Sequence, residues 1–285
     1  MDVVEQPACA NCGRPLIGPF CAGCGQKRTT VDLTFAEFLH ETTHELTHWD
    51  GKVPRTLKAL FLNPGLLTVD LFAGRRARWL SPLRLYLICS IAYFLSGPFV
   101  DAMTRRTERE MDSMTLTHPD GSKTLTPEVR EELEAGLPAR IFGLDRLERA
   151  VVNSDRFLRE IEAVRPKSMF ILVPLFAVFT RTLWRRRVPC YPAHLYFALH
   201  LHAAWFGILA LFTLFAGFVP YTAVSAAVGV AAFIYSIWYG LRAAREVFQD
   251  SWLLTIAKSS ALAVVYSACL FASSLVMLGF VLLRM

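Results

Sequence analysis

The stretch Leu195–Val219 reads LYFALHLHAAWFGILALFTLFAGFV and contains no Asp, Glu, Lys or Arg. A helix needs about 20 consecutive, mostly apolar residues to cross a bilayer core, so this stretch predicts a transmembrane helix. Four other stretches are also predominantly apolar, although the first two contain one arginine each: Leu83–Val100, Ser168–Trp184, Ala223–Leu241 and Ser259–Leu283. We therefore expect an all-α integral membrane protein with about five transmembrane helices.

The composition of the whole chain agrees with this expectation. Of the 285 residues, 54% are hydrophobic and 19% are charged, whereas an average soluble domain carries about 25% charged residues. A single soluble core could not bury so much apolar material, so the excess must face lipid. The composition thus excludes a disordered chain and an ordinary cytosolic enzyme.

The basic residues predict the orientation of these helices. They cluster beside the first span, between the second and third, and between the fourth and fifth, and the positive-inside rule places all three clusters in the cytoplasm if the N-terminus is cytoplasmic. We expect them to bind anionic lipid, and this placement argues against nucleic acid as the partner. The clusters are Arg75, Arg76, Arg78 and Arg84, then Arg181 and Arg185–Arg187, and finally Arg242, Arg245 and Lys258.

The spans divide the chain into five segments. In the long extracytoplasmic segment, Thr126 and Pro127 form a helix-start signal, and Leu144–Val164 has apolar residues at helical spacing. We interpret this segment as a helical cap on the spans, with ligand binding as the alternative. The segments are a cytoplasmic zinc ribbon (1–30), amphipathic or interfacial helices (31–82), the first transmembrane helix (83–100), the helical insert (101–167) and a four-helix transmembrane region (168–285).

The N-terminal segment contains two Cys-x-x-Cys pairs, Cys9 with Cys12 and Cys21 with Cys24, each followed directly by glycine. Four thiolates form a closed tetrahedral zinc site, so the metal would be structural and not catalytic. So short a segment cannot build a stable core, and metal binding would supply most of its folding free energy. Disulfides are the alternative, but they require an oxidising compartment.

Two groups of histidines are further candidates. In Thr34–Trp49, helical spacing places His40, His44 and His48 on the face opposite the apolar stripe, and His40-Glu41-x-x-His44 matches the zincin motif. This pattern fits an interfacial helix with a solvated histidine face, a metal or haem site, or least well a protease. His194, His200 and His202 lie in the third span or at its edge. They are either neutral histidines with hydrogen-bond partners, or ligands of a metal or haem site shared with the first group.

The order of these motifs resembles that of an uncharacterised family of bacterial membrane proteins, the domain of unknown function 3667. The resemblance implies a multi-pass protein of the inner membrane with a cytoplasmic N-terminus, and it implies no activity. The motifs that carry it are CxxCG…CxxCGQK (Cys9–Lys27), His-Trp-Asp-Gly (His48–Gly51), Asn-Pro-Gly (Asn63–Gly65) and Gly-Arg-Arg-Ala-Arg-Trp-Leu-Ser-Pro (Gly74–Pro82).

These features support two hypotheses about function. The first is a membrane scaffold or adaptor, whose structural zinc ribbon recruits a protein partner or senses the membrane surface. It is favoured because the sequence has no nucleophile triad, phosphate loop or paired carboxylates. The alternative is a membrane-embedded metal- or haem-dependent enzyme, or a small-molecule transporter, that uses the two groups of histidines.

Overall fold

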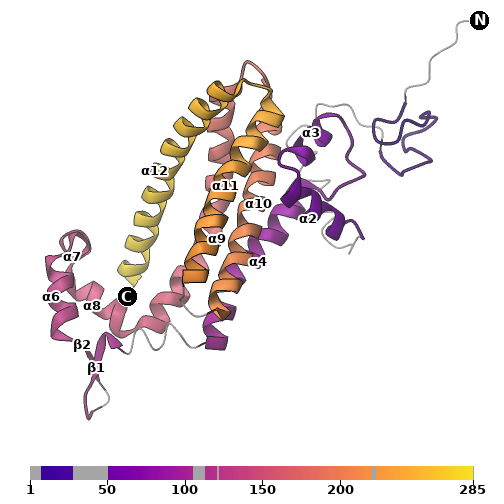
Figure 1. The fold of residues 1–285 in the computed structure, drawn as a ribbon. Coiled ribbons are helices and arrows are strands. Elements are labelled where there is room, and N and C mark those ends of the chain that lie inside the picture. Colours follow the sequence, from indigo (N-terminus) through magenta and orange to yellow (C-terminus); the bar gives the residue numbers. More distant parts are fainter. Residues whose placement is uncertain (1–7, 28–50, 105–112, 121, 220–222, 285) are drawn as a thin grey trace, which may run out of the picture. The chain divides into compact units, whose positions relative to one another are not determined.

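The computed structural model describes residues 8–27, 51–104, 113–120, 122–219 and 223–284, and within them the chain is mainly helical (Figure 1). The helices are α2 (Val53–Leu62), α3 (Leu66–Phe72), α4 (Pro82–Thr104), α6 (Pro127–Ala135), α7 (Leu137–Phe142), α8 (Leu144–Val152), α9 (Ser154–Trp184), α10 (Tyr191–Phe218), α11 (Ala223–Phe248) and α12 (Trp252–Arg284), and the strands are β1 (Thr115–Thr117) and β2 (Lys123–Leu125).

Five helices in the described part of the chain, α4 and α9 to α12, are long and apolar enough to cross a membrane. They cover the five apolar stretches, apart from Val219 at the end of the third, and most extend beyond them. For example, α11 continues past Leu241 to Phe248, and α4 continues through Pro98 to Thr104. The chain divides into two compact units, and each of the long helices contributes to both.

The first unit comprises Met1–Tyr93, Val173–Phe212 and Ala226–Ala263, and the first half of α10 forms its core. Almost every residue from Ala193 to Ile208 is buried, as expected of a helix that is apolar on all sides. Helix α2 packs against this helix at Gly207, where an added Cβ would lie 2.5 Å from the Phe61 ring. A side chain at Gly207 would therefore force the Phe61 ring to move.

Helix α11 binds the end of α2 through two tyrosines. The hydroxyl of Tyr239 donates to the carbonyl oxygen of Leu60 at 2.7 Å, and the hydroxyl of Tyr235 donates to that of Phe61. The last carbonyls of a helix have no partner inside it, so these tyrosines cap α2 from another helix.

The turn between α2 and α3 also contacts α11. Gly65 has φ +88°, a conformation that favours glycine. A Cβ at this position would lie 2.9 Å from Cβ of Glu246 and 3.1 Å from the carbonyl oxygen of Ala243. The Asn-Pro-Gly turn therefore requires glycine for both its backbone conformation and its close approach to α11.

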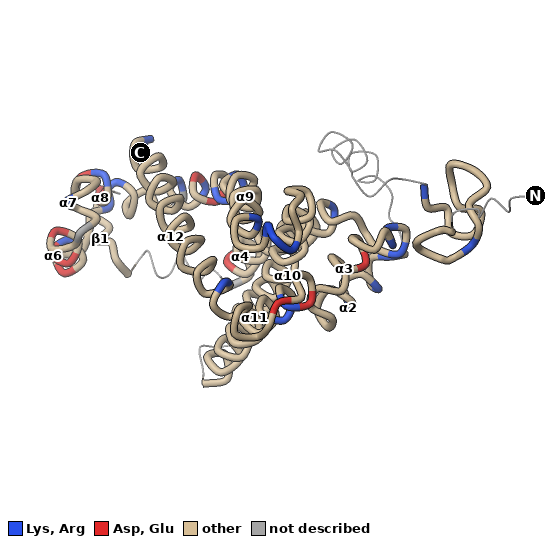
Figure 2. Tube along the Cα trace, turned by 90° about the horizontal axis from the view of Figure 1, so that it is seen from above, with Lys and Arg blue, Asp and Glu red and all other residues tan. Residues whose placement is uncertain are grey.

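The second unit comprises Phe94–Leu172, Thr213–Ser225 and Val264–Met285. Its helices α6 to α8 pack on the end of α12, where Leu147, Ala150 and Leu282 form a small buried core. Acidic residues gather on α6 (Figure 2). At the end of α12, the Arg284 carbonyl accepts a hydrogen bond from Arg156 at 3.0 Å.

Two features of the second unit differ from the sequence expectations. Strands β1 and β2 form an antiparallel hairpin, which the interpretation of the insert as helical did not include. The hairpin forms here because its β-branched threonines favour strands. In addition, the helix expected over Leu144–Val164 is interrupted. Helix α8 ends at Val152, and α9 begins at Ser154 and continues without a break to Trp184. Asn153, whose side chain bonds the Arg149 carbonyl, favours this interruption.

Candidate metal centre

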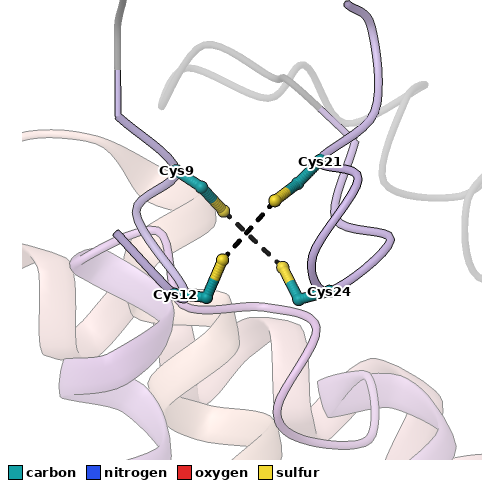
Figure 3. Close-up of side chains that lie close together, drawn as sticks. All are labelled: Cys9, Cys12, Cys21 and Cys24. Carbon is teal, nitrogen blue, oxygen red and sulfur yellow. Dashed lines mark hydrogen bonds between the residues drawn. The ribbon is translucent and has the colours of Figure 1, made fainter. Parts of the chain in front are cut away.

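Four cysteines from two separate loops point toward one centre (Figure 3). Their Sγ atoms all lie within 4.8 Å of one another, with Cys9 to Cys24 at 3.6 Å and Cys12 to Cys21 at 3.5 Å. A disulfide would require about 2.05 Å, whereas sulfurs at the corners of a tetrahedron around zinc lie about 3.8 Å apart. The cysteines are free thiols in an arrangement compatible with a metal site.

The two loops have the same backbone hydrogen bonds. In the first, the N–H of Cys9 donates to Arg14 and the N–H of Gly13 donates to Cys9, both at 2.8 Å; the second repeats the pattern with Cys21, Gln26 and Gly25. Gly13 and Gly25 have φ of +75° and +71°, which only glycine adopts at little cost. The Cys-x-x-Cys-Gly repeat therefore builds the same tight turn twice and brings all four sulfurs together.

The surrounding donors favour the thiolate form at two of the cysteines. The Asn11 side chain and the Gln26 backbone N–H hold the pKa of Cys24 at about 6, and the Gly23 N–H lowers the pKa of Cys21. At Cys12, the Arg14 N–H lowers the pKa, but the hydrogen bonds with the other three cysteines and burial together outweigh it and raise the pKa to about 11. Because the thiolate is the metal ligand, these lowered pKa values favour metal binding at Cys21 and Cys24.

Gln26 attaches this cluster to the loop that follows α3. Its side-chain amide Nε2 donates to the carbonyl oxygen of Gly74 at 2.8 Å. Its Oε1 accepts from the backbone N–H groups of Arg76 at 3.1 Å and Ala77 at 3.0 Å. The two surfaces are close, because a Cβ at Gly74 would lie 3.1 Å from Cβ of Ala10. One neutral side chain thus satisfies three backbone groups across 48 to 51 residues of sequence.

The same loop is held on its other side by Asp70 of α3, which is only 2% exposed. Asp70 Oδ1 accepts from Nε and Nη2 of Arg75 at 2.9 and 2.6 Å, and Oδ2 accepts from Nε1 of Trp79 at 2.7 Å. Arg78 lies 3.6 Å from the same carboxylate. The sequence interpretation missed Asp70; its only signal was a lone carboxylate in the apolar run of α3.

A second buried carboxylate, Asp250, joins the α9–α10 connection to α12. It accepts from Arg187 Nε at 3.0 Å and from Lys258 Nζ at 2.7 Å. Burial disfavours its charged form, but these hydrogen bonds outweigh burial and hold the pKa of Asp250 below its ordinary value. These contacts join the α9–α10 connection to the α11–α12 connection at one end of the first unit.

The three described histidines of α10 do not form a shared site. His40, His44 and His48, with the helix expected over Thr34–Trp49, lie outside the described residues. The buried histidines of α10 each have a separate partner: His194 Nε2 with the Val188 carbonyl at 2.8 Å, His200 Nδ1 with Thr68 Oγ1 at 2.9 Å, and His202 Nδ1 with the Ala198 carbonyl at 2.8 Å. Among the described His, Cys, Asp and Glu residues, the geometry of a metal site occurs at the four cysteines.

Fold and site together define a helical protein with five candidate membrane-spanning helices and a four-cysteine cluster at its N-terminal end. Residues 50–94 match the model of a family described as a protein of unknown function (DUF3667). The matched segment contains α2, α3, the Gly74–Ala77 loop and the first half of α4, which are the parts that contact the cysteine loops and α10. No curated protein and no solved structure matches the chain significantly.

Proposed function

We propose that this protein is a multi-pass scaffold of the bacterial inner membrane, whose cytoplasmic zinc ribbon presents a recognition surface beside the first membrane span. The observation that carries the proposal is the bonding of Gln26 to Gly74, Arg76 and Ala77. Through it, the ribbon is held against the segment that leads into α4. A ribbon serving only as a flexible tail would need no such attachment.

The metal of the proposal is structural zinc bound by Cys9, Cys12, Cys21 and Cys24. Four sulfur ligands in a tetrahedral arrangement suit zinc or iron–sulfur chemistry, and paired Cys-x-x-Cys turns around a single centre are typical of zinc ribbons. A shell of four thiolates leaves no coordination position for a substrate. The metal therefore stabilises the ribbon, and the role we propose is not enzymatic.

The orientation rests on the basic residues at one end of the first unit. Arg187 and Lys258 share Asp250, and the Gly65 turn contacts the end of α11 that carries Arg242 and Arg245. We assign this end to the cytoplasm by the positive-inside rule, where its exposed basic side chains would meet anionic lipid. Helices α6 to α8, which follow the first candidate span in the chain, are then extracytoplasmic.

Reporter fusions test the orientation. A reporter after Arg187 should be cytoplasmic, whereas reporters after Thr104 and after Arg284 should be extracytoplasmic. A cytoplasmic reporter after Arg284 would contradict the assignment, because five spans must place the two ends of the chain on opposite sides.

Counting metals in the purified full chain tests the function. One zinc per chain, lost when a ribbon cysteine is replaced, supports the scaffold. A second metal or a haem absorption band that survives this replacement supports the alternative, a metal- or haem-dependent enzyme or transporter. The candidate ligands of that second site are His40, His44, His48, His194, His200 and His202.

A further inference from the structure

The loop between the two cysteine pairs exposes apolar side chains. This loop, Pro15–Phe20, reads PLIGPF, and we call it the ribbon tip. Ile17 is 89% exposed and Phe20 is 58% exposed, whereas the residues buried in the ribbon are the ligands Cys9 and Cys21. Since the centre of the ribbon is occupied by thiolates, its large apolar side chains point outward.

The ribbon tip has a defined conformation. Backbone bridges close its base on both sides, between Ala8 and Pro15 and between Phe20 and Lys27. Pro15 and Pro19 restrict the backbone further by fixing φ. The apolar side chains are therefore presented by an ordered loop, which loses little conformational entropy when it contacts another surface.

The Arg and Lys side chains beside the ribbon tip have no acidic neighbour in the ribbon sequence. Arg14 precedes the tip and Lys27 pairs with Phe20 at its base. The described ribbon, residues 8–27, contains basic but no acidic side chains (Figure 2). Apolar side chains next to basic ones are the combination that binds the interface of an anionic bilayer. A purely apolar pocket on a protein would have no use for the flanking cations.

The ribbon is attached close to a membrane entry point. Gln26, next to Lys27, bonds the Gly74–Ala77 loop, and the chain enters the candidate span α4 at Pro82. Only a few residues of chain therefore separate the attachment point from the bilayer surface. In the proposed topology, the anionic headgroups around this entry point offer the tip a surface of complementary charge.

We infer that the ribbon tip is a membrane-contact surface, in which Ile17 and Phe20 insert among anionic lipid headgroups while Arg14 and Lys27 bind their phosphates. This inference rests on the proposed insertion of the five helices, and it names the partner of the proposed recognition surface as the lipid itself. The zinc-held ribbon would then report the surface charge of the membrane in which the protein lies.

Photocrosslinking of the full-length, zinc-loaded protein in nanodiscs tests the inference. A photoreactive phenylalanine replaces Ile17 in one variant, Ala22 in a second and Phe233 in a third. Ala22 is an exposed residue of the second cysteine turn, and Phe233 is exposed on the candidate span α11. We expect lipid adducts at positions 17 and 233 and few at position 22.

The outcomes separate this inference from the proposed function. No lipid adduct at position 233 would show that α11 does not face lipid, and would overturn the proposed insertion. Adducts at 233 but not at 17, or equal yields at 17 and 22, would overturn the membrane contact alone. An adduct of position 17 with a protein chain would overturn it in favour of a protein partner.

The charged part of the interaction is tested by lipid composition. Replacing phosphatidylglycerol with phosphatidylcholine should reduce the yield at position 17 several-fold and leave that at position 233 unchanged. Arg14→Gln should reduce the yield in phosphatidylglycerol by about fivefold, the usual effect of one basic residue at an anionic surface. Equal yields in both lipids would contradict the role of the basic residues.

Discussion

Gln26 donates its side-chain amide to the carbonyl oxygen of Gly74 at 2.8 Å, and this bond joins the cysteine loops to the segment between α3 and α4. The residues lie 48 positions apart, one in the CGQK motif and the other at the start of the arginine-rich loop. The Gln26 side-chain amide both donates and accepts hydrogen bonds. It therefore satisfies backbone groups of the loop in the way that a neighbouring strand does in a sheet. The orientation of the four-cysteine cluster therefore depends on the Gln26 amide and on the close packing of Ala10 against Gly74.

The first prediction concerns this bond. Replacing Gln26→Ala removes the side-chain acceptor of the Ala77 N–H, whereas the Arg76 N–H also donates to the Gly74 carbonyl. The hydrogen exchange of the Ala77 N–H should therefore accelerate by about five- to tenfold, the effect of losing one ordinary hydrogen bond. Metal content should stay unchanged, because the cysteines are untouched. Lys58→Ala, at an exposed position of α2, is the control, and equal exchange in both variants would show that the attachment is not formed in solution.

The second prediction concerns the cysteine cluster. Cys12→Ser should release the metal and unfold residues 9–24, since the folding of so small a unit is coupled to metal binding. The long helices should remain in the membrane fraction, because their insertion depends on apolar length. Metal analysis and limited proteolysis measure both effects. Cys190→Ser, at an exposed cysteine outside the cluster, should behave as the unchanged protein; full metal retention in Cys12→Ser would refute the site.

The third prediction concerns Asp250 and pH. Asp250→Asn removes the shared counter-charge of Arg187 and Lys258, and should destabilise the protein by about 1–3 kcal/mol, as for a buried hydrogen-bonded charge whose partners are partly solvated. The folded pKa of Asp250 lies below its ordinary value. Its contribution is therefore complete above the unfolded pKa near 3.9 and lost as the pH falls through the folded value.

Thermal unfolding in detergent measures this effect. At pH 7 the Asp250→Asn variant should unfold at a lower temperature than the unchanged protein, and the difference should shrink below about pH 4. A difference that stays constant from pH 7 to pH 3 would show that the charge of Asp250 is not responsible.

The fourth prediction concerns the turn between α2 and α3. Gly65→Ala should cost about 2–4 kcal/mol, because it combines a strained positive φ with a clash against α11. The matched control is Gly97→Ala in α4, where an added Cβ meets nothing within 4 Å and alanine is the better helix former. Unfolding in detergent compares the two variants. A stability loss as large in Gly97→Ala would mean that the packing at Gly65 is not the cause.

The sequence by itself determined the features that depend on neighbouring residues. Apolar runs such as Leu195–Val219 predicted the five long helices, because the length and composition of a segment are local properties. The spacing of Cys9, Cys12, Cys21 and Cys24 predicted their clustering, since each Cys-x-x-Cys-Gly turn is closed by its own backbone bonds. These are the parts of the fold that need no distant partner to be recognised.

Only the tertiary structure decided which distant residues meet. Asp70 appeared as an isolated acid in an apolar run, yet it accepts hydrogen bonds from Arg75 and Trp79. Arg75, which its sequence position places among the arginines expected to bind lipid, therefore has a partner inside the protein. The α10 histidines are 2 to 8 positions apart but bond to three different places, because side chains around a helix point in different directions. The contact of Gln26 with Gly74 depends on the packing of two segments that no local pattern relates, and for that reason the sequence could not reveal it.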